Sequence, residues 1–278
     1  MSNKKKRIDK LLVDRGFFES REKAKRALMA GNIKIKEEII DKPGTRVSLD
    51  SDIEVTERMK YVGRGGYKLE KALEFFNIDL KNKVCMDIGA STGGFTDCML
   101  QNGAKKVYSV DVGYGQLDWS LRNDKRVLVY ERTNFRYLKT EDIEVKIDFF
   151  TADVSFISLK HIFPNVGELA ENGSIFLSLI KPQFEAGKNK VEKGGIIRNI
   201  DTHYEVLSNV ALYAEENNFY LHDLTFSPIK GAKGNIEYLG KFLKKCKNSE
   251  ENIEKLIDVT IKKAFNELND WKCCINMQ

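Results

Sequence analysis

The chain has 278 residues, 42% of them hydrophobic and 31% charged, which is enough for one large domain with a proper core and a smaller domain. No apolar run approaches the ~20 residues of a membrane span, and the N-terminal residues lack the apolar stretch of a secretory signal. The five cysteines show neither a disulfide framework nor a zinc spacing, so we expect a reducing compartment, the cytoplasm, and no metal.

The positive charge is concentrated at the N-terminal end of the chain. The net charge is +5, yet residues 1–36 contain twelve Lys or Arg and only four Asp or Glu. This end therefore carries +8, and the remaining residues together carry −3. Such a field favours a phosphate-bearing partner, although Lys4, Lys5 and Lys6 alone are equally well explained as a solvated tail.

Two short helices and several short strands are predicted first. Ile8, Leu11 and Leu12 have helical spacing and predict a helix over 7–16. A second helix is predicted from Ser20, its N-cap, to Ala30. Strand-like segments follow at 33–36, 47–49 and 52–55. The polar side of the second helix is basic and suits an RNA backbone; it carries Arg21, Lys23, Lys25 and Arg26.

This layout resembles the RNA-binding domain first known from small-subunit ribosomal protein four, the S4 domain. The matching residues are Arg7, Leu11, Gly16, Ser20, Arg21, Ala24, Gly31, Lys42, Pro43 and the segment 52–55. The resemblance implies structured RNA as the partner, with Arg7, Arg15, Arg21, Lys23, Lys25 and Arg26 as its contacts. We place this domain at 1–58; the alternative is a protein-docking domain with incidental basic residues.

A glycine-rich linker is predicted at 59–66, and helix and strand patterns alternate from 67 to 278. Strands are predicted at 84–87, 106–111, 127–131, 148–153, 174–180, 220–226 and 235–242. Helices are predicted at 67–76, 95–101, 117–122, 159–169, 202–217 and 251–268. The alternation predicts an α/β fold with a doubly wound, mostly parallel sheet. In such a fold the ligand lies beyond the carboxyl ends of the strands.

The segment after the first of these strands reads Asp87-Ile-Gly-Ala-Ser-Thr-Gly-Gly-Phe95. Its glycines allow a sharp turn, and the helix start beyond them offers N–H groups to a polar ligand. The middle glycine of a dinucleotide-binding motif is replaced by Ser91, so a pyrophosphate is poorly served. We therefore expect a smaller nucleoside cofactor, S-adenosylmethionine. The residues expected to bind it here are Asp87, Gly89, Ala90, Ser91, Thr92, Gly93, Gly94 and Phe95.

Further polar residues follow the next predicted strands. Asp111 ends the second strand, 22 residues after Gly89, where an acid can bind a ribose, although it is also a possible helix cap. Val112 is expected to contact the cofactor, and Thr133 with Asn134, after the third strand, are expected near the adenine. Asp153, which closes the fourth strand, is expected at both the cofactor and the reaction centre.

Several motifs in chain order resemble the TlyA family, also called haemolysin A. They are 63–69, 87–95, 111–124, 131–134, 153–159, 181–185 and 234–238. The family implies a Rossmann-like class I methyltransferase fold of the FtsJ-like group and 2′-O-methylation of cytidine in ribosomal RNA by S-adenosylmethionine. The resemblance also implies a catalytic tetrad of Lys68, Asp153, Lys181 and Glu237. Arg64 and Phe156 resemble substrate-facing positions, although Phe156 is nearly as well explained as a core residue.

The tetrad suits the chemistry of a ribose 2′-hydroxyl, which must lose its proton as it attacks the methyl carbon. A lysine can be the base when burial or a second cation lowers its pKa. We assign Lys181 as the base and Lys68 as the neighbouring charge and oxyanion partner. Asp153 and Glu237 then orient the two lysines, and no metal is needed.

Three other functions stay open at this point. They are a membrane-lytic protein, a non-catalytic ribosome-assembly factor, and a base methyltransferase. The last is disfavoured because the fourth strand ends Asp153-Val-Ser-Phe instead of Asn/Asp-Pro-Pro-Tyr/Phe. The resemblance implies rRNA of the small subunit, the large subunit or both as the substrate. The N-terminal module and the long C-terminal helix resemble the longer form of the family, which modifies both. We expect a monomer without a membrane partner.

Overall fold

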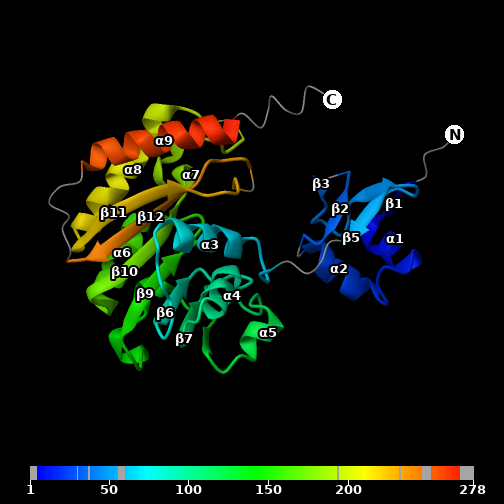
Figure 1. The fold of residues 1–278 in the computed structure, drawn as a ribbon, viewed down its shortest axis with the longest axis horizontal. Coiled ribbons are helices and arrows are strands. Elements are labelled where there is room, and N and C mark those ends of the chain that lie inside the picture. The colour runs from blue at the N-terminus through cyan, green and yellow to red at the C-terminus, as the bar shows by residue number, and fades with distance from the viewer. Residues whose placement is uncertain are drawn as a thin grey trace. The chain divides into compact units, whose positions relative to one another are not determined.

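The computed structural model divides into two compact units, Met1–Gly66 and Tyr67–Gln278 (Figure 1). The structure describes residues 5–29, 31–36, 38–55, 60–192, 194–231, 233–245 and 252–269. Lys4, Ala30, the first residue of the predicted linker 59–66, the first residue of the predicted helix 251–268, and three of the five cysteines (Cys246, Cys273 and Cys274) lie outside these ranges. The unit boundary falls inside helix α3 (Gly65–Phe75), which begins within the predicted linker 59–66.

In the N-terminal unit, two helices pack against a small sheet. Helices α1 (Ile8–Asp14) and α2 (Arg21–Met29) share a core with strand β2 (Ile33–Ile35). The sheet has the order β3 (Glu38–Ile39), β2 and β5 (Ile53–Val55). A separate antiparallel pair joins β1 (Lys5–Arg7) to β4 (Arg46–Ser48). The sequence did not predict β1, because its three basic residues show no apolar alternation.

The second unit is built on a seven-stranded sheet of order β11-β12-β10-β9-β6-β7-β8. The strands are β6 (Val84–Ile88), β7 (Lys106–Val110), β8 (Val127–Tyr130), β9 (Ile147–Ala152), β10 (Ala170–Ile180), β11 (Phe219–Phe226) and β12 (Tyr238–Lys244). Neighbours from β10 to β8 pair in parallel, whereas β12 is antiparallel to both β10 and β11. The predicted doubly wound, mostly parallel sheet is confirmed.

Helices cover the sheet on both faces (Figure 1). Side chains of α6 (Phe163–Leu169), α8 (Ile200–Glu215) and α9 (Ile253–Asn269) share one core with alternate strand residues such as Met86 and Ile88. Asp87, between these two residues, points to the other face and bonds to α4 (Gly94–Gln101). The period-2 alternation of a strand thus sends its side chains to two different helix layers.

Two short elements near the carboxyl ends of the strands differ from the prediction. The helix predicted over 159–169 is divided into a 3-10 turn, η3 (Leu159–His161), and α6. Pro164 lies in the first turn of α6, where a missing N–H is tolerated. Helix α7 (Pro182–Glu185), directly after β10, was not predicted. It is too short for the helical pattern of apolar residues to show.

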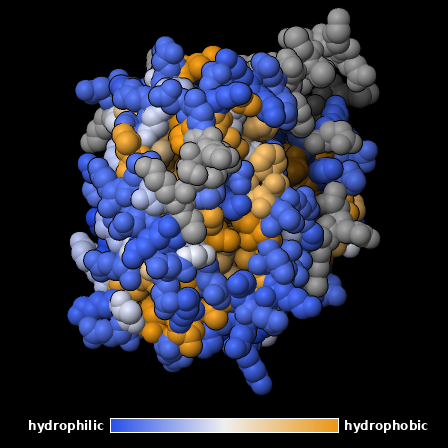
Figure 2. Space-filling view, turned by 60° about the vertical axis from the view of Figure 1, so that its left-hand side comes forward, coloured by the Kyte–Doolittle hydropathy of each residue, from blue (hydrophilic) through white to orange (hydrophobic). Residues whose placement is uncertain are grey.

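No helix among the described residues is both long and apolar enough to cross a membrane. Figure 2 shows one face of the molecule, where hydrophobic side chains lie among a larger number of hydrophilic ones. Three of the exposed aromatic residues follow β7 or β9 in the sequence; they are Tyr114, Trp119 and Phe156.

Candidate active site

The glycine loop between β6 and α4 turns sharply beside the end of β9. Gly89 has φ +84° and Gly93 has φ +94°, conformations that glycine adopts easily. A Cβ on Gly89 would lie 3.1 Å from the carbonyl oxygen of Asp153. A Cβ on Gly93 would lie 2.3 Å from Leu121 Cδ1. The loop therefore needs glycine at both positions, and its tip at Ser91 is exposed.

Two of the predicted cofactor residues lie beneath this loop and do not reach its surface. Asp87 is fully buried, and its carboxylate accepts hydrogen bonds from the backbone N–H and the hydroxyl of Thr96, at 2.9 and 2.7 Å. Burial raises the pKa of Asp87 to about 7. Phe95 is also buried. Both side chains support the loop from below, and direct contact of these residues with the cofactor stays a prediction.

The remaining loop residues are divided between the tip and the start of α4. Ser91 and Thr92 are exposed, whereas Ala90 and Gly94 are buried. Buried small residues can still offer backbone groups to a ligand, because they have little or no side chain to shield them. Direct binding through these four residues stays a prediction.

Asp111 lies next to the loop and lines a hollow of about 210 Å³. Its carboxylate accepts the backbone N–H of Ser91 at 2.8 Å and that of Gly113 at 2.7 Å. Each carboxylate oxygen can accept more than one hydrogen bond, so capacity is left for ribose hydroxyls. Glu131 and Gln116 also line the hollow. Two carboxylates beside a glycine loop fit the sugar of a nucleoside cofactor.

The residues predicted near the adenine lie around Asp111. Val112 is 71% exposed, and the backbone N–H of Thr133 donates to the Asp111 carbonyl at 3.0 Å. The Asn134 side chain accepts the N–H of Arg136 at 3.2 Å and so caps the following 3-10 turn, η1 (Phe135–Tyr137). Thr133 therefore adjoins Asp111, while the Asn134 amide already has a local partner. Contact of these residues with adenine stays a prediction.

The four predicted tetrad residues meet in one alternating chain of charges. Lys181 Nζ lies 2.5 Å from Asp153 Oδ1, and Lys68 Nζ lies 4.0 Å from Asp153 Oδ2. Lys68 Nζ also donates to Glu237 Oε2 at 2.7 Å. Lys68 is on α3, Asp153 follows β9, Lys181 follows β10 and Glu237 precedes β12. Segments that are far apart in the sequence are thus joined where the parallel strands β9 and β10 end.

Neighbouring groups hold this chain of charges in place. The Ser155 hydroxyl accepts a second hydrogen bond from Lys181 at 3.0 Å, and Gln183 donates to Glu237 Oε1 at 3.2 Å. A Cβ on Gly231 would lie only 2.4 Å from Glu237 Oε1, so glycine makes room for this carboxylate. The two lysine side chains are only 9% and 12% exposed, and burying an ammonium is tolerable when a carboxylate faces it.

Two of the predicted RNA contacts outside the N-terminal basic set have different surroundings. Phe156 is 91% exposed, has φ +63° and lies against Phe184, with ring centroids 5.0 Å apart. The alternative of a core phenylalanine is therefore wrong. Arg64 is half-exposed, 3.8 Å from Asp41. Both stay predictions as RNA contacts.

The predicted basic residues of the N-terminal unit differ in how far their charged groups are already engaged within the protein. Arg7 and Arg21 share the buried carboxylate of Asp9, at 3.0 and 2.8 Å. Arg15 donates to the carbonyl oxygens of Leu49 and Ser51, so its guanidinium links α1 to the end of the small sheet. Three further basic residues of this set lie on α2: Lys23 pairs with Glu19, Lys25 pairs with Glu22, and Arg26 is exposed.

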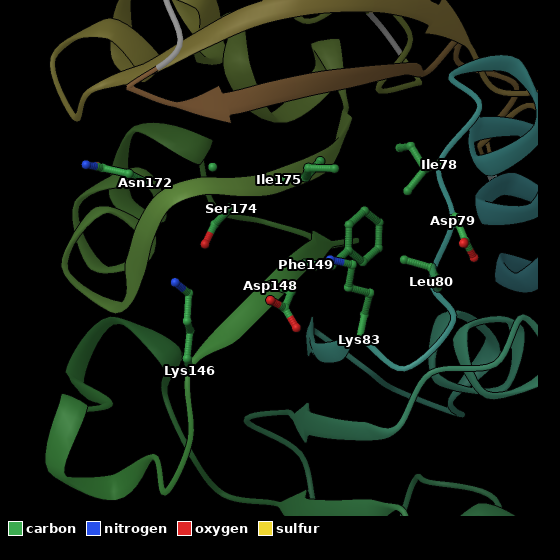
Figure 3. A pocket seen from close by; sticks show the side chains of 11 residues that line it. Ile78, Asp79, Leu80, Lys83, Lys146, Asp148, Phe149, Asn172, Ser174 and Ile175 are labelled. Carbon is green, nitrogen blue, oxygen red and sulfur yellow. The ribbon is translucent and has the colours of Figure 1, made fainter.

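A larger hollow, of about 490 Å³, lies at the other end of the sheet (Figure 3). Lys83 just before β6, Lys146 just before β9 and Asp148 near the start of β9 line it. Asp153 follows the opposite end of β9, so this hollow lies at the amino ends of the parallel strands. Ligands of doubly wound sheets bind at the carboxyl ends. We therefore assign it no part in the chemistry.

Sequence reasoning missed several residues that complete the two sites. Glu131 ends a predicted strand at the carboxyl edge and begins the motif 131–134, but neither signal reveals the hollow that it lines. Gln183 and Glu185 lie in the motif 181–185, but the motif does not reveal their partners. Asp9 carried no signal, because an acid in a short helix is usually exposed.

A glycine-lined nucleoside site next to a Lys-Asp-Lys-Glu cluster, at the carboxyl edge of this sheet, defines a Rossmann-like methyltransferase. The FtsJ-like methyltransferase family matches residues 61–244, and the S4 domain matches residues 6–53. The chain belongs to the TlyA group of FtsJ-like, S-adenosylmethionine-dependent methyltransferases, with an N-terminal S4 domain. The resemblance stated from the sequence, its fold and its cofactor are confirmed.

Known relatives cover most of the chain. A Bacillus subtilis protein provisionally named rRNA methyltransferase YqxC is 51% identical over 86% of this chain and 86% of its own length. The 16S/23S rRNA (cytidine-2′-O)-methyltransferase TlyA of Mycobacterium tuberculosis is 42% identical over 84% of this chain and 87% of its own. A solved structure from Streptococcus thermophilus, provisionally named a hemolysin, covers 97% of this chain and all of its own, with 42% identity and a TM-score of 0.74.

Proposed function

We propose that this protein methylates the ribose 2′-hydroxyl of a cytidine in ribosomal RNA, with Lys68, Asp153, Lys181 and Glu237 as its catalytic residues. The observation that carries the proposal is the alternating chain of charges from Lys181 through Asp153 and Lys68 to Glu237. It lies beside the glycine loop, because Gly89 adjoins the Asp153 backbone. The name of the M. tuberculosis relative supports the same substrate. That substrate would place the enzyme in the cytoplasm, among the ribosomes.

Bound S-adenosylmethionine supplies an electrophilic methyl group on a sulfonium. The sulfur becomes a neutral thioether when the methyl group is transferred. The protein's share is to position the ribose and to manage one proton. Lys181 must first release to solvent the ammonium proton of its ion pair with Asp153; its free amine then takes the proton of the 2′-hydroxyl while the oxygen attacks the methyl carbon. Asp153 holds the Lys181 nitrogen in place and faces the ammonium that forms.

Lys68 serves as the electrostatic partner of the developing oxyanion. Its ammonium is anchored by Glu237 at 2.7 Å and lies 4.0 Å from Asp153. The Asp153 carboxylate is the group that links Lys68 to Lys181. A charge fixed before the reaction stabilises the oxyanion without reorganisation at the moment of transfer. Much of the acceleration would come from holding hydroxyl, methyl and sulfur in line.

The RNA would be held by both units. Arg7 and Arg21 present guanidinium groups that remain half-exposed while paired to Asp9. Such groups suit phosphate oxygens, which arginine can bind in bidentate fashion. Phe156, exposed next to the tetrad, would stack on the acceptor nucleotide.

The test uses isolated small and large ribosomal subunits incubated with the purified full chain and methyl-labelled S-adenosylmethionine. We expect one or both rRNAs to gain a 2′-O-methyl at a cytidine, mapped at nucleotide resolution. The Lys181→Ala variant should bind cofactor normally and transfer no methyl. Methylation of a base, or of no RNA, would refute the proposal. Full activity of the variant would refute the base assignment.

A further inference from the structure

Two segments that carry tetrad residues interlock along their length. Asp153 begins the segment 153–159, and Lys181 begins the segment 181–185. Lys181 Nζ contacts the Asp153 carboxylate at 2.5 Å and donates to the Ser155 hydroxyl at 3.0 Å. Further along, the Phe156 and Phe184 rings lie 5.0 Å apart at 48°.

The last contact of the two segments is made by Glu185 at the end of α7. Its Oε2 accepts the Ser158 hydroxyl at 2.6 Å, and its Oε1 accepts the Leu159 backbone N–H at 2.9 Å. Burial raises the pKa of Glu185, while these two hydrogen bonds oppose that rise. Both oxygens are thus used on the first turn of η3, where N–H groups lack helical partners. Nothing in the proposed reaction uses this carboxylate.

Between these anchors the chain adopts an unfavourable conformation. Phe156 has φ +63° and is 91% exposed. The left-handed region is strained for a bulky residue, and an exposed ring does not offset that strain by burial. Such a conformation persists only where the surroundings fix it. Here Lys181 holds the loop on one side of Phe156, through Ser155, and Glu185 holds it on the other.

We propose that Glu185 is a positioning residue, which fixes the loop 154–158 so that Phe156 is presented at the tetrad to the acceptor nucleotide. The inference rests on the proposed function, because it needs an RNA nucleotide as the substrate. Glu185 acts through Ser158 and Leu159 and touches neither the cofactor nor the RNA.

The test is a double-mutant cycle with Glu185→Ala and Phe156→Ala, read by steady-state and single-turnover methylation of ribosomal subunits. Glu185→Ala should lower kcat/KM for RNA about 10–100-fold, since misplacement by ~1 Å can cost about 100-fold. Cofactor affinity should stay within about twofold, because the glycine loop is untouched. The double variant should lose no more than Phe156→Ala alone, because Glu185 acts only through that ring.

Two further variants separate positioning from mere stability. Glu185→Gln should restore most of the activity, because an amide oxygen still accepts the Leu159 N–H and the amide nitrogen can donate to Ser158. Glu205→Gln removes the same charge on the exposed side of α8, where Glu205 pairs with Lys190, and should change nothing. If Glu185→Ala melts below the assay temperature, the cycle is run with Ser158→Ala, which deletes one of the two donors.

The outcomes are distinct for the two proposals. A wild type that leaves every ribose unmethylated overturns the proposed function and this inference with it. A wild type that methylates RNA, combined with losses from Glu185→Ala and Phe156→Ala that multiply, overturns this inference alone. A purely structural role would lower the melting temperature of Glu185→Ala and leave its kcat/KM for RNA unchanged at permissive temperature.

Discussion

Each unit of the molecule contains an ionic cluster, and the two clusters use the same kinds of group in opposite ways. In the N-terminal unit, one fully buried carboxylate, Asp9, serves two arginines whose side chains stay 41% and 44% exposed. In the catalytic unit, two lysines and two acids alternate, and none of the four side chains is more than 23% exposed. The first cluster has an excess positive charge toward solvent, whereas the second is balanced and enclosed.

The difference follows from what each cluster is proposed to meet. A polyanion is attracted by positive charge that is hydrated and not neutralised by an acid. The single carboxylate of Asp9 orients both Arg7 and Arg21 but neutralises only one of their two charges. A buried ammonium without a counter-ion would be costly, so Lys68 and Lys181 each need an acid within reach. An excess of charge thus marks the proposed binding surface, and balance marks the proposed reaction centre.

Removing one cation from each cluster tests whether one cluster binds RNA and the other carries out the reaction. Lys181→Met should lower the single-turnover rate about 10²–10⁴-fold, the usual contribution of a general base. Arg21→Met should raise the RNA concentration needed for half-maximal rate and leave the rate at saturating RNA unchanged. Quench-flow methylation at saturating cofactor measures both. Equal losses of rate in the two variants would contradict the division of roles.

The balanced cluster should also be the more sensitive to losing an acid. Glu237→Ala leaves Lys68 without its nearest counter-ion and should destabilise the catalytic unit by about 3 kcal/mol. Denaturant unfolding followed by tryptophan fluorescence reports this unit, since Trp119 belongs to it and residues 1–66 contain no tryptophan. Glu205→Ala, which breaks an exposed pair, is the control and should cost less than about 1 kcal/mol. A similar cost for both variants would show that the enclosed pairing contributes nothing.

The buried acids of the two units should respond to pH with opposite sign. The Arg7 guanidinium, with Arg21 beside it, lowers the pKa of Asp9 to about 2. Because an unfolded aspartate titrates near about 4, Asp9 contributes about 2 kcal/mol above that pH, which is lost as the pH falls through 2. Burial raises the pKa of Asp87 to about 7, so its contribution is full below about pH 4 and is lost as the pH rises through 7.

Thermal unfolding of the full chain across pH 2–8 measures the two effects. Asp9→Asn should flatten the rise in stability between pH 2 and 4, and Asp87→Asn should flatten the decline between pH 4 and 7. A profile unaffected by either variant would refute both assignments.

The smallest effect concerns salt. Arg21→Ala should reduce the slope of log affinity for rRNA against log salt by about 1, the signature of one lost phosphate contact. Filter binding at several salt concentrations gives the slope. Lys262→Ala on α9, which pairs with Asp258, removes the same charge elsewhere and should leave the slope unchanged. An unchanged slope in Arg21→Ala would remove this arginine from the RNA surface.

The sequence alone predicted the sheet and the glycine loop, and it named four residues whose side chains the structure brings together; their surroundings were not predictable. Asp111 was found because strand ends in a parallel sheet share one edge, and the tetrad was found by resemblance to known motifs. The partners of Glu185 and Gln183 depend on contacts between segments 26 to 54 positions apart, which no local pattern encodes. Asp9 was missed for the same reason, because Arg21, one of its partners, lies in the next helix.

The close approach of Gly89 to Asp153 ties the glycine loop to the backbone that carries a tetrad acid. The neighbour that a Cβ on Gly89 would meet first is a main-chain carbonyl, at 3.1 Å. A main chain cannot turn aside as a side chain can, so a side chain at position 89 could be accommodated only by moving the backbone just after β9. A substitution there would therefore displace Asp153, and with it the ion pairs that this residue makes with Lys68 and Lys181.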